Sequence, residues 1–95
     1  PRQFDKKPRT GPYTIAEYQT THTCGGVGVG ADPTTSVVNR YLQSWDVSNL
    51  FVTGATVFPQ NAGYNPTGTV CALAYWAADA LVNQYIKHPG PLVQA

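Results

Sequence analysis

Apolar positions recur most regularly in the last third of the chain. From Pro66 to about Ile86 their spacing fits the period of a helix better than that of a strand. The positions are Val70, Leu73, Ala74, Ala77, Leu81 and Ile86, with Tyr75, Trp76 and Tyr85 among them. This pattern predicts one long C-terminal helix that is mostly buried. Asn65 suits the N-cap, and Pro66 suits the first helical position because its φ is already helical. The turn-forming run at 88–91 ends the helix.

Shorter apolar stretches precede this helix. Residues 13–21 are rich in aromatic, β-branched and threonine side chains, which predicts a short strand leading into His22. Two further stretches, at 37–38 and 50–52, are separated by polar, turn-forming residues and predict two more short strands. Residues 1–12 hold three prolines and much of the basic charge, which predicts an extended surface segment. The fold class predicted is therefore α/β.

Composition changes this picture in one respect. The chain has 95 residues, 42% of them hydrophobic and only 12% charged, which is a high apolar share for a small domain in water. We therefore expect a segment of a larger protein, not a complete independent domain. A net charge of +1 without a basic stripe gives no footprint for nucleic acid. No run of about 18 apolar residues is present, so no membrane span is predicted.

The stretch Thr20 to Pro33, TTHTCGGVGVGADP, places His22 three residues before a run of glycines. A dinucleotide fingerprint would follow a strand and open a helix, whereas this run continues into Asp-Pro. Two interpretations remain open: the glycines let the chain pass close to a flat ligand or another backbone, or they adopt positive φ. The histidines and cysteines lack the spacing of metal ligands, and Cys24 has no evident orienting partner for nucleophilic catalysis.

Four motifs carry a resemblance to a known family. They are HTCGG, SVVN, WDVSNLFVTGATVFP and GYNPTGTVCALAYWAADAL, in that order. In order and spacing they resemble the C-terminal end of the glucose-methanol-choline (GMC) family of flavin oxidoreductases. Within it, they are most similar to the large flavoprotein subunits of the gluconate 2-dehydrogenase type, which includes fructose and sorbitol dehydrogenases. The resemblance covers about residues 13–95 and implies the C-terminal segment of an FAD-binding fold. Relatives commonly carry GxxMG where this chain has GGVGVG and no methionine.

The resemblance implies two catalytic residues. His22 matches the active-site histidine over the reactive edge of the flavin, where a neutral imidazole takes the hydroxyl proton of the alcohol. Asn65 matches the asparagine that hydrogen-bonds the reacting hydroxyl. Two simpler interpretations stay open, because His22 could be a polar loop residue and Asn65 could serve only as a helix cap.

The resemblance also implies contacts with FAD. The helix start, at Pro66, Thr67 and Gly68, lies near the flavin, where unpaired N–H groups stabilise negative charge, and Asn65 adjoins it. Gly54 and Ala55 match the segment beside the ribityl and phosphate groups. The alternative for Gly54 is a strand that simply turns at glycine.

The function expected from the resemblance is FAD-dependent oxidation of a secondary alcohol in a sugar acid, polyol or ketose such as gluconate. The expected partners are the remainder of the same flavoprotein, a small subunit and a cytochrome c subunit, in the periplasm. The alternatives are an oxidase, a flavin-binding but inactive fragment, and a non-enzymatic interaction module. A disulfide between Cys24 and Cys71 is a further hypothesis.

Overall fold

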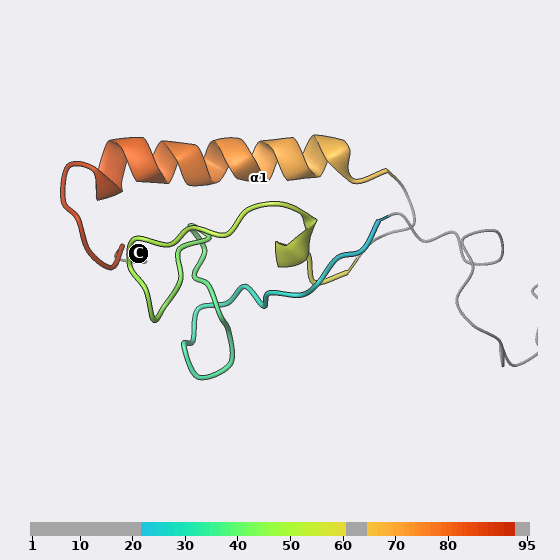
Figure 1. Ribbon diagram of the computed structural model, residues 1–95, viewed down its shortest axis with the longest axis horizontal. Coiled ribbons are helices and arrows are strands. Elements are labelled where there is room, and N and C mark those ends of the chain that lie inside the picture. Colours follow the sequence, from blue (N-terminus) through green and yellow to red (C-terminus); the bar gives the residue numbers. More distant parts are fainter. Residues whose placement is uncertain (1–21, 61–64, 93–95) are drawn as a thin grey trace, which may run out of the picture.

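The computed structural model describes residues 22–60 and 65–92. Helix α1 spans Thr67–Ala80 and continues into the π-helical turn η2, Leu81–Tyr85. A short 3-10 turn, η1, spans Ala55–Val57. In Figure 1, α1 lies along one side of the irregular segment 22–60. The predicted surface segment 1–12 and the predicted strand at 13–21 lie outside the described residues.

The predicted C-terminal helix is confirmed, and one of its sides packs against the core. The buried side chains of α1 are Ala77 and Ala80, and Val70 and Leu73 pack against the same core from one turn to the next. Residues at these spacings share one side of a helix. The turn η2 then shifts to a wider hydrogen-bond pattern, in which the Ile86 N–H donates to the Leu81 carbonyl at 2.9 Å.

The expectation that this helix is mostly buried is wrong for the part of the chain described. Tyr75 is 81% exposed, Val82 55% and Ile86 64%. The pattern of apolar residues gave no indication of this, because apolar side chains occur on both sides of α1 while the segment 22–60 covers only one. The opposite side of the helix faces solvent.

The α/β class is not borne out, because the described residues contain no strand. The expected strands at 37–38 and 50–52 are reduced to isolated bridges, Val29 with Val38 in parallel, and Val38 with Ser44 and Gln43 with Phe51 in antiparallel orientation. The ladders stop because the chain turns at Asn39, whose side-chain oxygen accepts hydrogen bonds from the N–H groups of Tyr41 and Gln43. Such local side-chain bonds compete with sheet pairing.

A small core joins α1 to the irregular segment. Its buried members are Val38, Leu42, Val57, Phe58 and Ala77, with Cys24, Val27, Val52, Ala55, Val70 and Leu73 packed around them. Side chains from the glycine-rich segment, from η1 and from α1 therefore meet in one cluster. The burial of this cluster fixes how these three segments lie relative to one another.

A buried polar residue, Gln43, fastens the end of the chain to this core. Its Nε2 donates to the carbonyls of Ser48 at 2.7 Å and Gly90 at 2.9 Å. Its Oε1 accepts from the Leu92 N–H at 2.8 Å and from the Asn39 amide at 3.2 Å. The Gln43 side chain is 1% exposed, so these bonds replace all of its contact with water.

Candidate functional site

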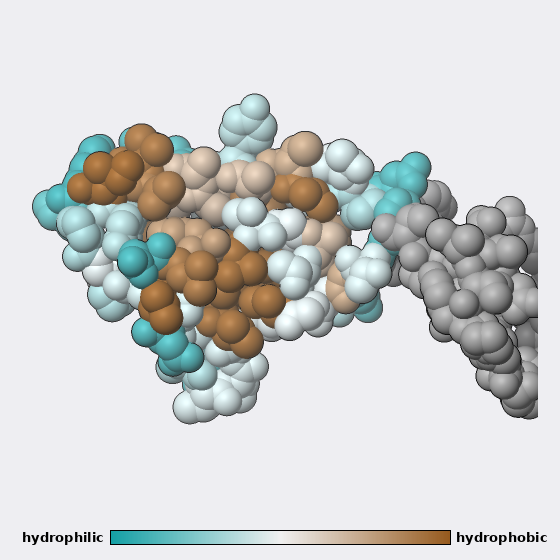
Figure 2. All heavy atoms as spheres, in the orientation of Figure 1, coloured by the Kyte–Doolittle hydropathy of each residue, from teal (hydrophilic) through white to brown (hydrophobic). Residues whose placement is uncertain are grey.

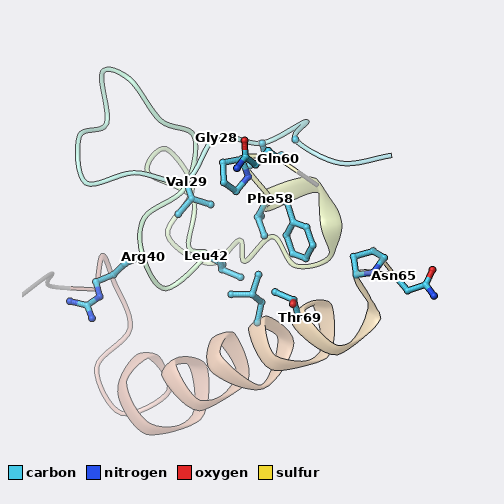
Figure 3. A pocket seen from close by; sticks show the side chains of 14 residues that line it. Gly28, Val29, Arg40, Leu42, Phe58, Gln60, Asn65 and Thr69 are labelled. Carbon is cyan, nitrogen blue, oxygen red and sulfur yellow. The ribbon is translucent and has the colours of Figure 1, made fainter. Parts of the chain in front are cut away.

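A groove of about 810 Å³ lies between α1 and the two segments that pack against it (Figure 3). One wall comes from the glycine-rich segment, at Gly25 and 27–29, and another from residues 57–60. The third comes from the start of α1, at Asn65, Pro66, Thr69 and Leu73. Three stretches of the chain thus contribute to one concave surface, which is where a ligand site is expected.

The glycines allow close contact between two backbones. Gly25 has φ +81°, and a Cβ there would lie 3.2 Å from the Phe58 carbonyl oxygen. The Gly25 N–H donates to the Ala55 carbonyl at 3.3 Å, and the Val27 N–H donates to the Thr56 carbonyl at 2.9 Å. A Cβ on Gly26 would approach Thr56 Oγ1 to 2.9 Å. Both interpretations of this run, close approach to another backbone and positive φ, therefore hold at Gly25.

The same hydrogen bonds bring together two of the predicted site segments. One segment contains His22, three residues before Gly25. The other contains Ala55, a predicted cofactor contact, whose carbonyl accepts a hydrogen bond from the Gly25 N–H. The His22 side chain is exposed and is not among the described residues that line the groove. Its segment therefore adjoins the groove, while its imidazole lies outside the lining.

Asn65 and Pro66 do line the groove, but Asn65 does not cap the helix. Pro66 occupies the N-cap position with φ −89° and ψ 0°, and its carbonyl accepts the Val70 N–H at 2.9 Å. This ψ lies between the helical and extended regions, so regular helix begins one residue later than predicted, at Thr67. The prediction of an Asn65 cap is therefore wrong. In Figure 3 its exposed amide points away from the helix and the groove.

The first turn of α1 has the electrostatics of an anion-facing helix end. The structure shows no side-chain hydrogen bond that caps it and no acidic residue within it. The first N–H groups, from Thr67 onward, have no partner inside the helix, and the positive end of the helix dipole lies there. Thr67 and Gly68 are exposed beside the groove and do not line it, whereas Thr69 does.

Gly54 and Ala55 belong to the segment that leads into the groove wall at 57–60. Gly54 has φ +100° and immediately precedes η1, so a residue with a side chain would be strained there. Ala55 is half-buried and packs against the core. Neither residue is among the described residues of the groove lining. The Ala55 carbonyl joins this segment to the glycine-rich segment.

Sequence reasoning missed the far end of the groove. Arg40 lies at the end opposite Asn65 (Figure 3), with its guanidinium 5.5 Å from the centre of the Tyr41 ring. The Arg40 carbonyl accepts the Trp76 indole N–H at 2.8 Å, and Tyr41 stacks on Trp76. These contacts join positions that are 36 residues apart, and no sequence pattern indicated them.

Two other sequence hypotheses concern cysteine and metal chemistry. Cys24 and Cys71 are both free thiols, half-buried and exposed respectively, so the structure does not contain the disulfide. Within residues 22–60 and 65–92, no three His, Cys, Asp or Glu side chains gather as metal ligands do. In the same residues, no helix combines the length and apolarity that crossing a bilayer requires.

Comparisons with known proteins give the family. The model of the GMC oxidoreductase family matches residues 1–74. The chain is 68% identical over 78 residues to a gluconate 2-dehydrogenase flavoprotein from Pantoea cypripedii, covering 82% of this chain and 13% of that protein. It is 40% identical over 62 residues to the large subunit of fructose dehydrogenase from Gluconobacter japonicus, covering 65% and 11% respectively.

A third relative, a 2-methyl-1,2-propanediol dehydrogenase from Mycolicibacterium austroafricanum, is 38% identical over 64 residues, covering 67% of this chain and 12% of its own. The chain thus spans 11–13% of the length of these three relatives. No solved structure matches it significantly. The family match over residues 1–74 confirms the resemblance carried by the four motifs, and the chain belongs to the GMC oxidoreductase family.

Proposed function

We propose that this chain forms one side of the active site of an FAD-dependent GMC dehydrogenase. The substrate is a secondary alcohol in a sugar acid, polyol or ketose of the gluconate class. One observation carries the proposal: the segment that begins at His22 is hydrogen-bonded to η1, and both adjoin the uncapped start of α1 at one groove. The names of two relatives, dehydrogenases of gluconate and of fructose, support the substrate class.

The residues at the helix start fit FAD. With no acidic or capping side chain in the first turn, the N–H groups of Thr67 and Gly68 can face the negative charge of a reduced flavin. Pro66, which has no N–H, would contact the ring through its apolar side, and Asn65 would lie next to it. Gly54 and Ala55 would hold the ribityl and phosphate region. When bound, FAD supplies the acceptor for the hydride.

His22 and Asn65 act on the hydroxyl group of the substrate in this proposal. The exposed His22 imidazole accepts the hydroxyl proton, which a neutral imidazole does well near neutral pH. Because Asn65 does not cap α1, its amide can serve the substrate instead. A rotation of its side chain from the outward direction in Figure 3 would be needed for this contact.

The partners proposed are the rest of the flavoprotein, a small subunit and a cytochrome c subunit that receives the electrons, in the periplasm. The name of the Gluconobacter relative, a large subunit, supports an assembly with further subunits. An oxidase that passes electrons to oxygen is the alternative. Peroxide released in step with substrate oxidation would favour the oxidase.

The test uses a chimera, called here the carrier: the Pantoea cypripedii flavoprotein with the region matching this chain exchanged for residues 1–95. His22→Ala should slow alcohol oxidation by about 10² to 10⁴, as loss of a general base does, while FAD stays bound. The matched control is His88→Ala, which removes the chain's other histidine, an exposed residue beyond η2. The measurement is anaerobic bleaching of flavin absorbance by gluconate in a stopped-flow cell.

Two results would contradict the proposal. A His22→Ala carrier that bleaches at the parental rate would exclude His22 as the base. A folded carrier that purifies without FAD would contradict the contacts proposed for the start of α1 and for Gly54.

A further inference from the structure

The outward side of α1 carries a second apolar stripe. Cys71, Tyr75, Ala78 and Val82 follow one another at helical spacing on the side opposite Ala77 and Ala80, and Ile86 continues the line just beyond η2. We call these five residues the outer stripe. All five are exposed, with Tyr75 at 81% and Ile86 at 64%. Figure 2 shows hydrophobic side chains gathered over the C-terminal part of α1.

This arrangement differs from that of a surface helix. A surface helix has one apolar stripe and a charged opposite face, whereas a helix that is apolar on both sides belongs in the interior of a larger protein. The only charged residue within α1 is Asp79, which lies at the edge of the outer stripe and accepts a hydrogen bond from the Asn83 amide at 2.7 Å. The small side chains at Cys71 and Ala78 would let another backbone approach closely.

A second copy of this chain is a poor occupant for the stripe. From Cys71 to Ile86 the helix is about 22 Å long and about 10 Å wide, so the stripe offers roughly 220 Å². A stable dimer buries about 800 Å² on each partner. Packing within one polypeptide has no such threshold, because the two surfaces are already tethered.

We propose that the outer stripe packs against the remainder of the same GMC flavoprotein. This inference rests on the proposed function, which makes the chain one side of a larger active site. The relatives are far longer than this chain, which spans 11–13% of them, so most of the polypeptide in such a protein lies outside residues 1–95. The matching surface is apolar and uncharged, and it presents a hydrogen-bond acceptor to the Tyr75 hydroxyl, since a buried tyrosine keeps a partner.

The packing positions the start of α1. The segment 22–60 covers one side of the helix and the rest of the flavoprotein covers the other, so the uncapped N–H groups at Thr67 are fixed from both sides. The outer stripe would therefore affect FAD retention without touching the substrate. This separates its effect from that of His22.

The first test measures accessibility in the carrier. Val82→Cys places a thiol on the outer stripe. Asn83→Cys is the control, because Asn83 is the adjacent exposed residue and lies off the stripe. Peptide mapping after brief treatment with a maleimide gives the labelling rate at each site. We expect labelling at position 82 to be at least 10-fold slower than at 83. Equal rates would overturn the proposal, and so would protection that depends on carrier concentration, because that result identifies a second copy.

The second test uses charge. Val82→Lys should lower the FAD content of the carrier at least 10-fold. Asn83→Lys places the same charge off the outer stripe, four residues after Asp79, and should leave the FAD content unchanged. The carrier molecules that still hold FAD should bleach at the parental rate, which distinguishes this effect from failure of the catalytic proposal. Parental FAD content in Val82→Lys would overturn the packing even if His22 behaves as proposed.

Discussion

The side-chain oxygen of Gln43 accepts a hydrogen bond from the backbone N–H of Leu92 at 2.8 Å, across 49 positions of sequence. The same side chain donates to the Gly90 carbonyl at 2.9 Å. One buried amide therefore holds two backbone groups near the end of the described chain. Since Leu92 follows η2, the bonds also fix the far end of the helix against the segment 22–60.

Gln43→Leu should destabilise the carrier. Leucine is similar in volume to glutamine, but it leaves the Leu92 N–H and the Ser48 and Gly90 carbonyls without a hydrogen-bond partner. Each unsatisfied buried group costs about 1–3 kcal/mol. We expect a loss of about 2–5 kcal/mol in the free energy of unfolding, measured by urea denaturation. Exposed Gln60→Leu serves as the control and should change it by less than about 0.5 kcal/mol. Equal losses in the two variants would contradict the role of Gln43.

Alanine substitutions should separate the required glycines from the tolerant ones. Gly25→Ala meets both a positive φ and a contact of 3.2 Å with the Phe58 carbonyl, and should cost about 1–3 kcal/mol. Gly28→Ala has open space and no positive φ, so its effect should be within about 1 kcal/mol of zero. Urea denaturation of the two carriers, measured side by side, gives the difference. A Gly28→Ala carrier as unstable as the Gly25→Ala carrier would refute the distinction between the two glycines.

Asn65→Ala should affect activity more than stability. Asn65 does not cap α1, so the usual loss of about 1 kcal/mol for removing a cap should be absent. If its amide orients the substrate hydroxyl, oxidation should slow about 2- to 12-fold, the equivalent of a neutral hydrogen bond of about 0.5–1.5 kcal/mol. The thermal midpoint and the bleaching rate of the carrier are measured together. A lowered midpoint with unchanged bleaching would restore Asn65 as a structural residue only.

Asp32 gives a prediction about pH. The Thr34 hydroxyl donates to its carboxylate at 2.7 Å and the Thr34 backbone N–H at 2.8 Å, and these bonds lower the pKa of Asp32. The ionised form is therefore favoured on folding, so its stabilising effect is present at neutral pH and is lost as pH falls through the lowered pKa.

Thr34→Val should raise the pKa of Asp32 part of the way to its usual range, because the backbone bond remains. A carboxyl-carbon NMR titration measures it. Thr35→Val is the matched control, since the Thr35 hydroxyl donates to the Asp32 backbone carbonyl and not to its carboxylate. The interpretation fails if both variants shift the titration equally.

The helix was predictable because its signal is local. Val70, Leu73 and Ala77 repeat at helical spacing whatever else surrounds them, and α1 with η2 covers most of the predicted range. The exact start of the helix was not predictable, because the ψ angle of Pro66 decides whether Asn65 or Pro66 is the N-cap residue. The strands failed for a related reason. The apolar pair at 37–38 has β-propensity, but the polar Asn39 turns the chain before a ladder can form.

The site was predictable only in part. The motif that contains His22 and the run around Gly54 lie in two segments that the structure joins through Gly25 and Ala55. Arg40 could not be found, because its place in the groove depends on a contact with Trp76 that folding alone creates. The roles of His22 and Asn65 stay predictions.

The turn η2 has a consequence for how this polypeptide tolerates changes in length. Five residues complete a turn that would ordinarily take fewer, so η2 acts as a one-residue insertion absorbed inside a helix. Removing one residue there would restore ordinary winding and leave the orientation of the downstream residues nearly unchanged, whereas the same deletion within α1 would rotate them by about 100°. After a deletion in α1, Tyr85, whose ring now meets Phe51 edge-on at 5.6 Å, would turn away from it, and the chain end would no longer reach Gln43. We therefore expect the polypeptide to tolerate the loss of one residue in η2 better than in α1.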